Sequence, residues 1–196
     1  GLGKTIEACL ILSRLLRTGR AERVTIVTPS TLTVQWLGEL YRKFHQIFVL
    51  LDENRRKDVF HDQGEDFNPF EVHPRSVISI EDLVNDNRAA RLAAEAKPDL
   101  LVVDEAHRLE RRQGHPGNPA YRAIAPIARA SKNVLFLSAT PLEADTYGFF
   151  RLLELLWPDQ FPSWEAFEAN LKKNVPLYPC TSSTRNSVCS DPIMPV

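Results

Sequence analysis

Short, uninterrupted apolar runs alternate along this chain with longer segments of helical periodicity. A continuous apolar run rich in β-branched residues is typical of a parallel strand that is buried on both faces. The five runs that predict strands are residues 24–28 (VTIVT), 47–51 (IFVLL), 77–80 (VISI), 100–104 (LLVVD) and 134–138 (VLFLS). This alternation predicts an α/β fold, with a doubly wound parallel sheet flanked by helices.

The segments between the runs differ in character. Apolar residues recur at intervals of three and four between residues 32 and 44, which predicts an amphipathic helix in which Gln35 and Trp36 pack or cap and do not bind a ligand. Residues 119–130 and 146–157 predict two more helices. Residues 52–74 are polar, acidic and rich in turn formers, so we expect a long loop there.

Length and composition indicate one domain, expected over residues 1–173, followed by an irregular connector or tail at 174–196. Since the chain opens at Gly1 and not at Met, we expect an internal fragment in which the first strand of the sheet is missing. No apolar run reaches the length of a membrane span and no signal-peptide pattern is present, so we expect a cytoplasmic protein with no membrane partner. The odd count of three cysteines favours reduced thiols.

Charge alone does not indicate a polyanionic partner, because 24 basic and 25 acidic residues give a net charge of −1. The distribution is uneven. Residues 1–57 carry 10 Lys or Arg against 5 Asp or Glu, and residues 58–110 carry 5 against 13. A basic face is therefore compatible with the sequence but is not required by it.

The chain opens with Gly1, Leu2, Gly3, Lys4 and Thr5, which match the end of the phosphate-binding loop G-x-x-x-x-G-K-[ST]. Glycines let backbone N–H groups approach phosphate oxygens, the start of the following helix (6–17) adds positive potential, Lys4 adds a charge, and Thr5 can ligate Mg²⁺. An ordinary glycine turn before a helix is the alternative interpretation of this motif taken alone.

Two carboxylates, Asp104 and Glu105, directly follow the apolar run LLVV and precede His107. Open α/β sheets bind ligands at the carboxyl ends of their strands. One carboxylate at such a place can hold Mg²⁺ and its water shell, while the other can orient or deprotonate an attacking water. A helix-capping acidic pair is the alternative, but it would have no reason to follow four apolar residues.

Short hydroxyl residues follow the last predicted strand in the same way, at Ser138 and Thr140 of the segment SATP. They could bond to His107 and transmit the state of a bound phosphate to other surfaces. By itself the segment is also compatible with a turn and an N-cap, so its weight comes from its order after the GKT and DEAH motifs.

Together the four ordered segments GLGKTIE, VTPSTLTVQWLGEL, VDEAHRL and LSATP resemble those of superfamily two helicase-like motors, in particular the Swi/Snf-type ATPases. The segments GLGKTIEA, QWLGELYRKF and NPF followed by VISIEDL are most similar to the bacterial branch associated with RNA polymerase. The resemblance covers residues 1–173 and implies a RecA-like first lobe, with ATP and Mg²⁺ as cofactors.

The resemblance also implies roles for individual residues. The ATP phosphates would be bound by the loop Gly1, Leu2, Gly3, Lys4 and Thr5, and Mg²⁺ by Thr5 and Asp104. Catalysis would involve Lys4 and Glu105. The coupling of hydrolysis to movement would involve His107, Ser138 and Thr140. Nucleic acid would contact the segments after two strands, through Thr28, Pro29, Ser30, Ser79 and Glu81. The family places ATP between two lobes, and the second lobe, which supplies an arginine finger, is absent from this chain.

We therefore expect the first lobe of an ATP-dependent double-stranded DNA translocase, with RNA polymerase as a candidate partner and with little activity in the fragment alone. Two alternatives remain open. One is the first lobe of an RNA helicase or a restriction-type motor, which the QWLGEL segment disfavours. The other is a non-catalytic lobe that only binds ATP or a partner protein.

Overall fold

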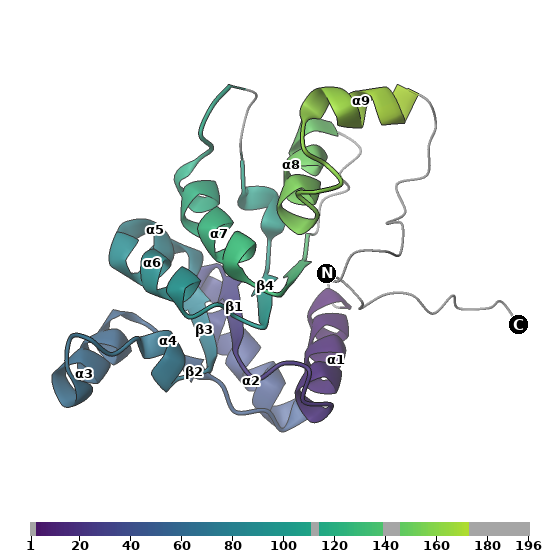
Figure 1. Ribbon diagram of the computed structural model, residues 1–196. Coiled ribbons are helices and arrows are strands. Elements are labelled where there is room, and N and C mark those ends of the chain that lie inside the picture. Colours follow the sequence, from purple (N-terminus) through teal and green to yellow (C-terminus); the bar gives the residue numbers. More distant parts are fainter. Residues whose placement is uncertain (1–2, 111–113, 139–145, 173–196) are drawn as a thin grey trace, which may run out of the picture.

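Five parallel strands form one sheet in the order β2-β3-β1-β4-β5, as the computed structural model shows over residues 3–110, 114–138 and 146–172. Figure 1 shows the sheet with helices around it. The strands are β1 (Val24–Thr28), β2 (Val49–Leu50), β3 (Arg75–Ser79), β4 (Leu100–Val103) and β5 (Asn133–Phe136). Each lies on a predicted run, so the predicted α/β parallel sheet is confirmed. The second run forms a strand only at Val49 and Leu50, which pair with β3 at the edge of the sheet.

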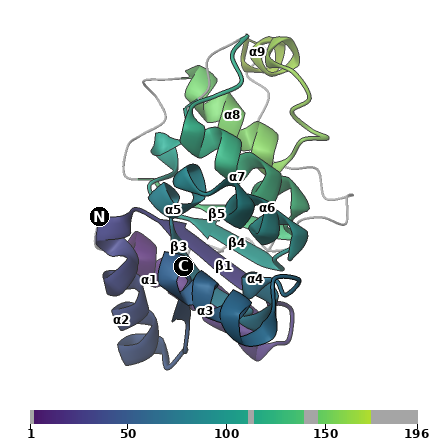
Figure 2. The same ribbon diagram turned by 90° about the vertical axis from the view of Figure 1, so that its left-hand side faces the viewer.

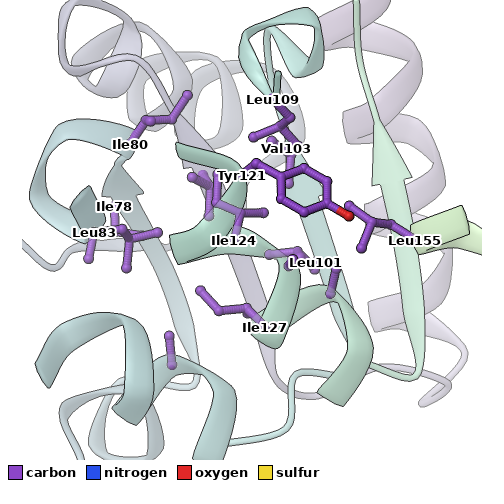
Figure 3. Packing of buried hydrophobic residues seen from close by; sticks show 14 of the residues in the cluster. Ile78, Ile80, Leu83, Leu101, Val103, Leu109, Tyr121, Ile124, Ile127 and Leu155 are labelled. Carbon is purple, nitrogen blue, oxygen red and sulfur yellow. The ribbon is translucent and has the colours of Figure 1, made fainter. Parts of the chain in front are cut away.

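Alternate side chains of the strands enter two separate cores, one on each face of the sheet. Val24, Ile26, Val77, Leu100 and Val102 pack under α1 (Lys4–Arg17) and α2 (Thr33–Phe44). The opposite face buries Val27, Ile78, Leu101 and Val103 under α5 (Ile80–Asn85), α6 (Asn87–Glu95) and α7 (Pro119–Ala130). Figure 2 shows α1 and α2 on one side of the strands and α5, α6 and α7 on the other, and Figure 3 shows the second core from close by.

The expectation of a long loop at residues 52–74 is wrong, because α3 (Glu53–Gln63) and α4 (Pro69–Val72) lie there. Each helix has an N-cap whose side chain accepts a backbone N–H bond. The Asp52 carboxylate accepts from the Arg55 N–H. The Asn68 side chain accepts from the Phe70 N–H, and α4 begins at Pro69 between them. Such caps stabilise short helices that have little apolar periodicity of their own.

A buried arginine ties α3 to the helices that follow β3. Arg56 is 3% exposed, and its guanidinium donates to the Leu51 carbonyl at 2.7 Å and pairs with Asp86 at 3.2 Å and Asp82 at 3.5 Å. Removing a buried cation of this kind destabilises the fold, because it leaves the carboxylates without their counter-ion. This tertiary contact supports a helix that sequence periodicity did not reveal.

Beyond α7 the chain forms α8 (Thr146–Leu156) and α9 (Trp164–Lys172), which build a small aromatic core of their own. Phe150, Phe161 and Phe167 are buried there, and the rings of Trp164 and Phe167 lie 5.7 Å apart. The predicted helix at 146–157 is confirmed, while α9 was not predicted. The expected tail at 174–196 lies outside the described residues. In the part of the chain that the structure describes, no helix is long and apolar enough to cross a membrane.

The strand order places a topological switch between β1 and β4. From β1 the chain leaves through α2 toward β2, whereas from β4 it leaves through α7 toward β5 on the opposite side. Open α/β sheets bind ligands in the crevice at such a point, beyond the carboxyl ends of the two strands. Here those ends are Thr28 and the residue after β4, Asp104.

Candidate functional site

The Asp104 carboxylate is the centre of the candidate site. Its backbone N–H donates to the Val27 carbonyl at 2.8 Å, which continues the pairing of β1 and β4 and brings the side chain to the switch point. Oδ1 accepts from the Glu105 N–H at 2.9 Å, and Oδ2 accepts from Trp36 Nε1 at 2.9 Å and from Thr28 Oγ1 at 3.5 Å. All three donors are neutral groups.

Glu105 occupies an unusual backbone conformation, with φ 53° and ψ 44°. A left-handed residue other than Gly or Asn costs about 1 to 3 kcal/mol and is concentrated at functional sites. The turn is retained by its surroundings, since the Ala106 N–H donates to the Leu137 carbonyl at 2.8 Å and starts the short 3₁₀ helix η2 (Ala106–Arg108). The Glu105 side chain meets His107, whose Nδ1 lies 3.1 Å from Oε2.

The predicted phosphate-binding residues begin α1. Gly1 and Leu2 lie outside the described residues, Gly3 is exposed, and Lys4 and Thr5 are half-buried in the first turn. Residues 18–23 join α1 to β1, so α1 runs back across the sheet and its first turn faces the carboxyl ends of the strands. Among the described residues, no hydrogen bond or ion pair joins Lys4 or Thr5 to the acidic pair.

The predicted coupling segment after β5 lies beside the acidic turn. The Leu137 N–H donates to the Val103 carbonyl at 2.9 Å, and the Leu137 carbonyl accepts the Ala106 N–H. Ser138 follows directly, whereas Thr140 lies outside the described residues. The described partner of the His107 ring is Glu105. The juxtaposition of the segments after β4 and β5 therefore agrees with the expectation, although bonds from Ser138 and Thr140 to His107 stay a prediction.

Two of the hydroxyl residues predicted to contact nucleic acid are buried. Thr28 is 0% exposed and faces Asp104, and Ser79 is 4% exposed and caps α5. Ser79 Oγ accepts from the Asp82 N–H at 2.9 Å and donates to the Asp82 carboxylate. Serine three residues before an acidic residue is an N-cap pattern, so the segment 79–82 is a strand-to-helix junction.

On this surface Ser30 is exposed and Glu81 is half-buried. Pro29 is buried and Ser30 is exposed at the start of the 3₁₀ helix η1 (Ser30–Leu32). The Ser30 N–H donates to Glu81 Oε2 at 2.9 Å, and Glu81 Oε1 lies 3.5 Å from Arg108 Nη1. Glu81 thus links the segment after β1 to the one after β4.

The donor set at the site fits Mg²⁺. The oxygens of Asp104, Glu105 and Thr5 are hard ligands of the kind that Mg²⁺ prefers. Within residues 3–110, 114–138 and 146–172, no group of three or more His, Cys, Asp and Glu side chains could hold a metal. Mg²⁺ is commonly bound through one or two carboxylates together with substrate phosphates, so the Asp104 carboxylate and the Thr5 hydroxyl would be sufficient if a nucleotide is present.

Trp36 is a site residue that sequence reasoning did not connect with the acidic pair. Its packing was predicted correctly, since it is 1% exposed on the inner face of α2. Its contact with Asp104 was not predicted. The available signal was the chemistry of the side chain, because a fully buried tryptophan usually finds an acceptor for its N–H.

Comparison with known families and proteins gives a consistent match. The sequence matches the SNF2-related domain over residues 1–189. The RNA polymerase-associated protein RapA of Vibrio cholerae serotype O1 (strain M66-2) is 41% identical over 179 residues, which cover 90% of this chain and 18% of that protein. RapA of Vibrio parahaemolyticus is 40% identical over 177 residues. The chain thus spans less than a fifth of the length of these curated relatives.

Solved structures show the same fold. The Sulfolobus solfataricus SWI2/SNF2 ATPase core in complex with dsDNA has a TM-score of 0.65 and 21% identity, and the alignment covers 88% of this chain and 34% of that one. The Sulfolobus solfataricus SWI2/SNF2 ATPase core domain has a TM-score of 0.64, also at 21% identity. The fold is therefore that of a RecA-like SWI2/SNF2 ATPase core lobe.

Proposed function

The chain belongs to the SNF2-related domain family, and on that premise we propose that it is the first, ATP-binding lobe of an ATP-dependent double-stranded DNA translocase. The observation that carries the proposal is the position of the acidic pair. Asp104 and Glu105 follow β4 directly at the switch point between β1 and β4, where α/β sheets bind ligands. A capping pair on the surface would not require Asp104 to be 6% exposed and bonded by three donors.

In the proposed reaction, Lys4 and the loop from Gly1 to Thr5 bind the phosphates of ATP, and Thr5 and Asp104 hold Mg²⁺. The ion would supply positive charge against the phosphate oxygens as negative charge develops on them. Glu105 accepts a proton from the attacking water, and the His107 ring at 3.1 Å orients its carboxylate. The loss of the terminal phosphate would be coupled to movement through His107, Ser138 and Thr140.

For duplex DNA we propose contact through the segment after β1, with the Ser30 hydroxyl as its exposed donor, since the Ser30 N–H already bonds to Glu81. A neutral hydroxyl at the carboxyl edge suits backbone phosphates, which position DNA without reading its bases. The residues beneath Ser30 would hold this segment in place; they are Thr28, Pro29, Ser79 and Glu81. The support is that one solved structure of the same fold is a complex with dsDNA.

We further propose that the lobe works with a second RecA-like lobe, and that the whole protein associates with RNA polymerase in the cytoplasm. The support for the polymerase is the name shared by the curated relatives, which are RNA polymerase-associated proteins. The second lobe would contribute charge to the transferred phosphoryl group, which is worth about 10³ to 10⁵ in rate in related reactions.

The proposal is tested by measuring equilibrium binding of ATP and Mg²⁺-dependent hydrolysis by the full-length protein, each with and without duplex DNA. We expect ATP binding in both conditions and hydrolysis that rises with DNA. Binding without hydrolysis in either condition would instead support the non-catalytic lobe. A rise with single-stranded RNA and none with duplex DNA would support an RNA helicase.

A further inference from the structure

The indole of Trp36 is aimed at the proposed Mg²⁺ ligand from inside the protein. In α2, Trp36 and Leu40 lie one turn apart on the buried face and pack with Ile26 and Val102 of the sheet. This packing fixes the ring, and the Nε1–H reaches Asp104 Oδ2 at 2.9 Å in a buried setting. Apolar packing alone does not require an N–H at this position.

Three donors together determine how the Asp104 carboxylate is rotated. The Glu105 N–H bonds to Oδ1 and belongs to the same turn, so it moves with the carboxylate. Thr28 Oγ1 is at 3.5 Å, the far limit for a hydrogen bond. The Trp36 bond is short and comes from a separate helix, so it is the contact that anchors Oδ2 to the rest of the fold.

Resting on the proposed function, we propose that Trp36 is a positioning residue for Mg²⁺ binding. Its N–H occupies one lone pair of Oδ2 and holds the carboxylate plane, so that the remaining lone pairs face the crevice between β1 and β4. Partners of this kind orient a ligand for its metal, and their loss typically lowers metal affinity or activity about 10- to 100-fold.

The test measures metal binding at equilibrium without turnover. Mn²⁺ serves as the probe, and free Mn²⁺ is followed by electron paramagnetic resonance in the full-length protein saturated with a non-hydrolysable ATP analogue. Trp36→Phe keeps an aromatic ring and removes the N–H. We expect its Mn²⁺ dissociation constant to rise about tenfold or more, while its affinity for the metal-free nucleotide stays at the parent value.

Trp164→Phe is the matched control. Trp164 packs against Tyr147, Phe150 and Phe167 in the α8–α9 aromatic core, to which neither Asp104 nor Glu105 belongs. The same chemical change there should leave Mn²⁺ binding unaltered.

Because Trp36→Phe also reduces core volume, a second variant replaces Trp36 with benzothienylalanine, which has the shape of tryptophan with sulfur in place of N–H. It should show the same loss of Mn²⁺ affinity.

A double-mutant cycle with Asp104→Asn separates positioning from packing. If Trp36 acts through Asp104, Trp36→Phe should add little to the loss already caused by Asp104→Asn. Parent-like Mn²⁺ affinity in the benzothienylalanine variant, or fully additive losses in the cycle, would overturn the proposal. Failure of the proposed function looks different, since the parent protein would then bind no nucleotide and Lys4→Ala would change nothing.

Discussion

The backbone N–H of Glu105 donates to the Asp104 side chain at 2.9 Å, while Glu105 itself is held at φ 53°. The two neighbouring carboxylates are therefore separated by the turn. Asp104 points back toward Trp36 and Thr28, and Glu105 points toward His107. In the proposed function, this divergence would allow Asp104 to bind a cation while Glu105 acts on a water.

Glu105→Gln should retain ATP binding and lose most hydrolysis in the full-length protein. The amide keeps the shape of the side chain but cannot accept a proton, and loss of a general base costs about 10² to 10⁴ in rate. Steady-state ATPase together with equilibrium nucleotide binding measures both effects. Glu110→Gln, the same change at an exposed residue nearby, is the control. Hydrolysis at the parent rate in Glu105→Gln would remove Glu105 from the role of base.

Lys4→Ala should weaken nucleotide binding itself. Deleting a charge-assisted bond to phosphate costs about 1.5 to 3 kcal/mol, which corresponds to roughly a 10- to 150-fold rise in the dissociation constant. Lys57→Ala is a suitable control, because Lys57 forms an exposed pair with Glu53 on α3. An ATP titration that shows the same affinity for Lys4→Ala and the parent would contradict the proposed phosphate contact.

Ser30→Glu should raise the DNA concentration needed for half-maximal stimulation of ATPase about fivefold and leave the DNA-free rate near the parent value. A new negative charge beside a backbone phosphate costs about 1 kcal/mol at a surface. The effect should shrink as salt screens the repulsion. Gln63→Glu adds the same charge at an exposed position on α3. Equal losses in both variants would indicate a general charge effect and not a contact at Ser30.

Asp99→Asn should destabilise the protein near neutral pH and have less effect in acid. Asp99 is 5% exposed, accepts the N–H groups of Glu22 and Arg23 at 2.9 Å each, and pairs with Lys132. Burial alone would raise its pKa, but the bond to Lys132 and the two backbone bonds outweigh burial and lower the pKa below its ordinary value of 3.8.

The sign of the pH dependence follows from that shift. A carboxyl group whose pKa is lower in the folded state stabilises the fold above its unfolded pKa, and this contribution is lost as the pH falls through the folded pKa. We expect Asp99→Asn to lower the free energy of unfolding by about 2 kcal/mol at pH 7. The gap between variant and parent in urea denaturation should narrow below pH 3.8. A gap that is equally wide at pH 7 and pH 3 would contradict this account.

Sequence reasoning predicted the fold class because its signals are local. The runs at β1, β3 and β4 are rich in apolar residues and almost fully buried, because these three strands lie in the interior of the parallel sheet. Asp104 and Glu105 were identified for the same reason, as polar residues placed directly after such a run. By contrast, α3 was missed because its stability comes from the Asp52 cap and from Arg56 buried against Asp82 and Asp86, and not from apolar periodicity.

Local sequence patterns thus identify the residues that end the buried strands, and hence the side chains that lie along one edge of the sheet. Which of those strand ends are neighbours depends on how the sheet and its helices pack. The order β2-β3-β1-β4-β5 sets Thr28 against Asp104, and α2 brings the Trp36 indole to the same carboxylate across 68 positions of the chain. Periodicity encodes which face of an element is buried. It does not encode which donor on that face meets an acceptor far along the chain, because that pairing depends on how the whole sheet and its helices pack.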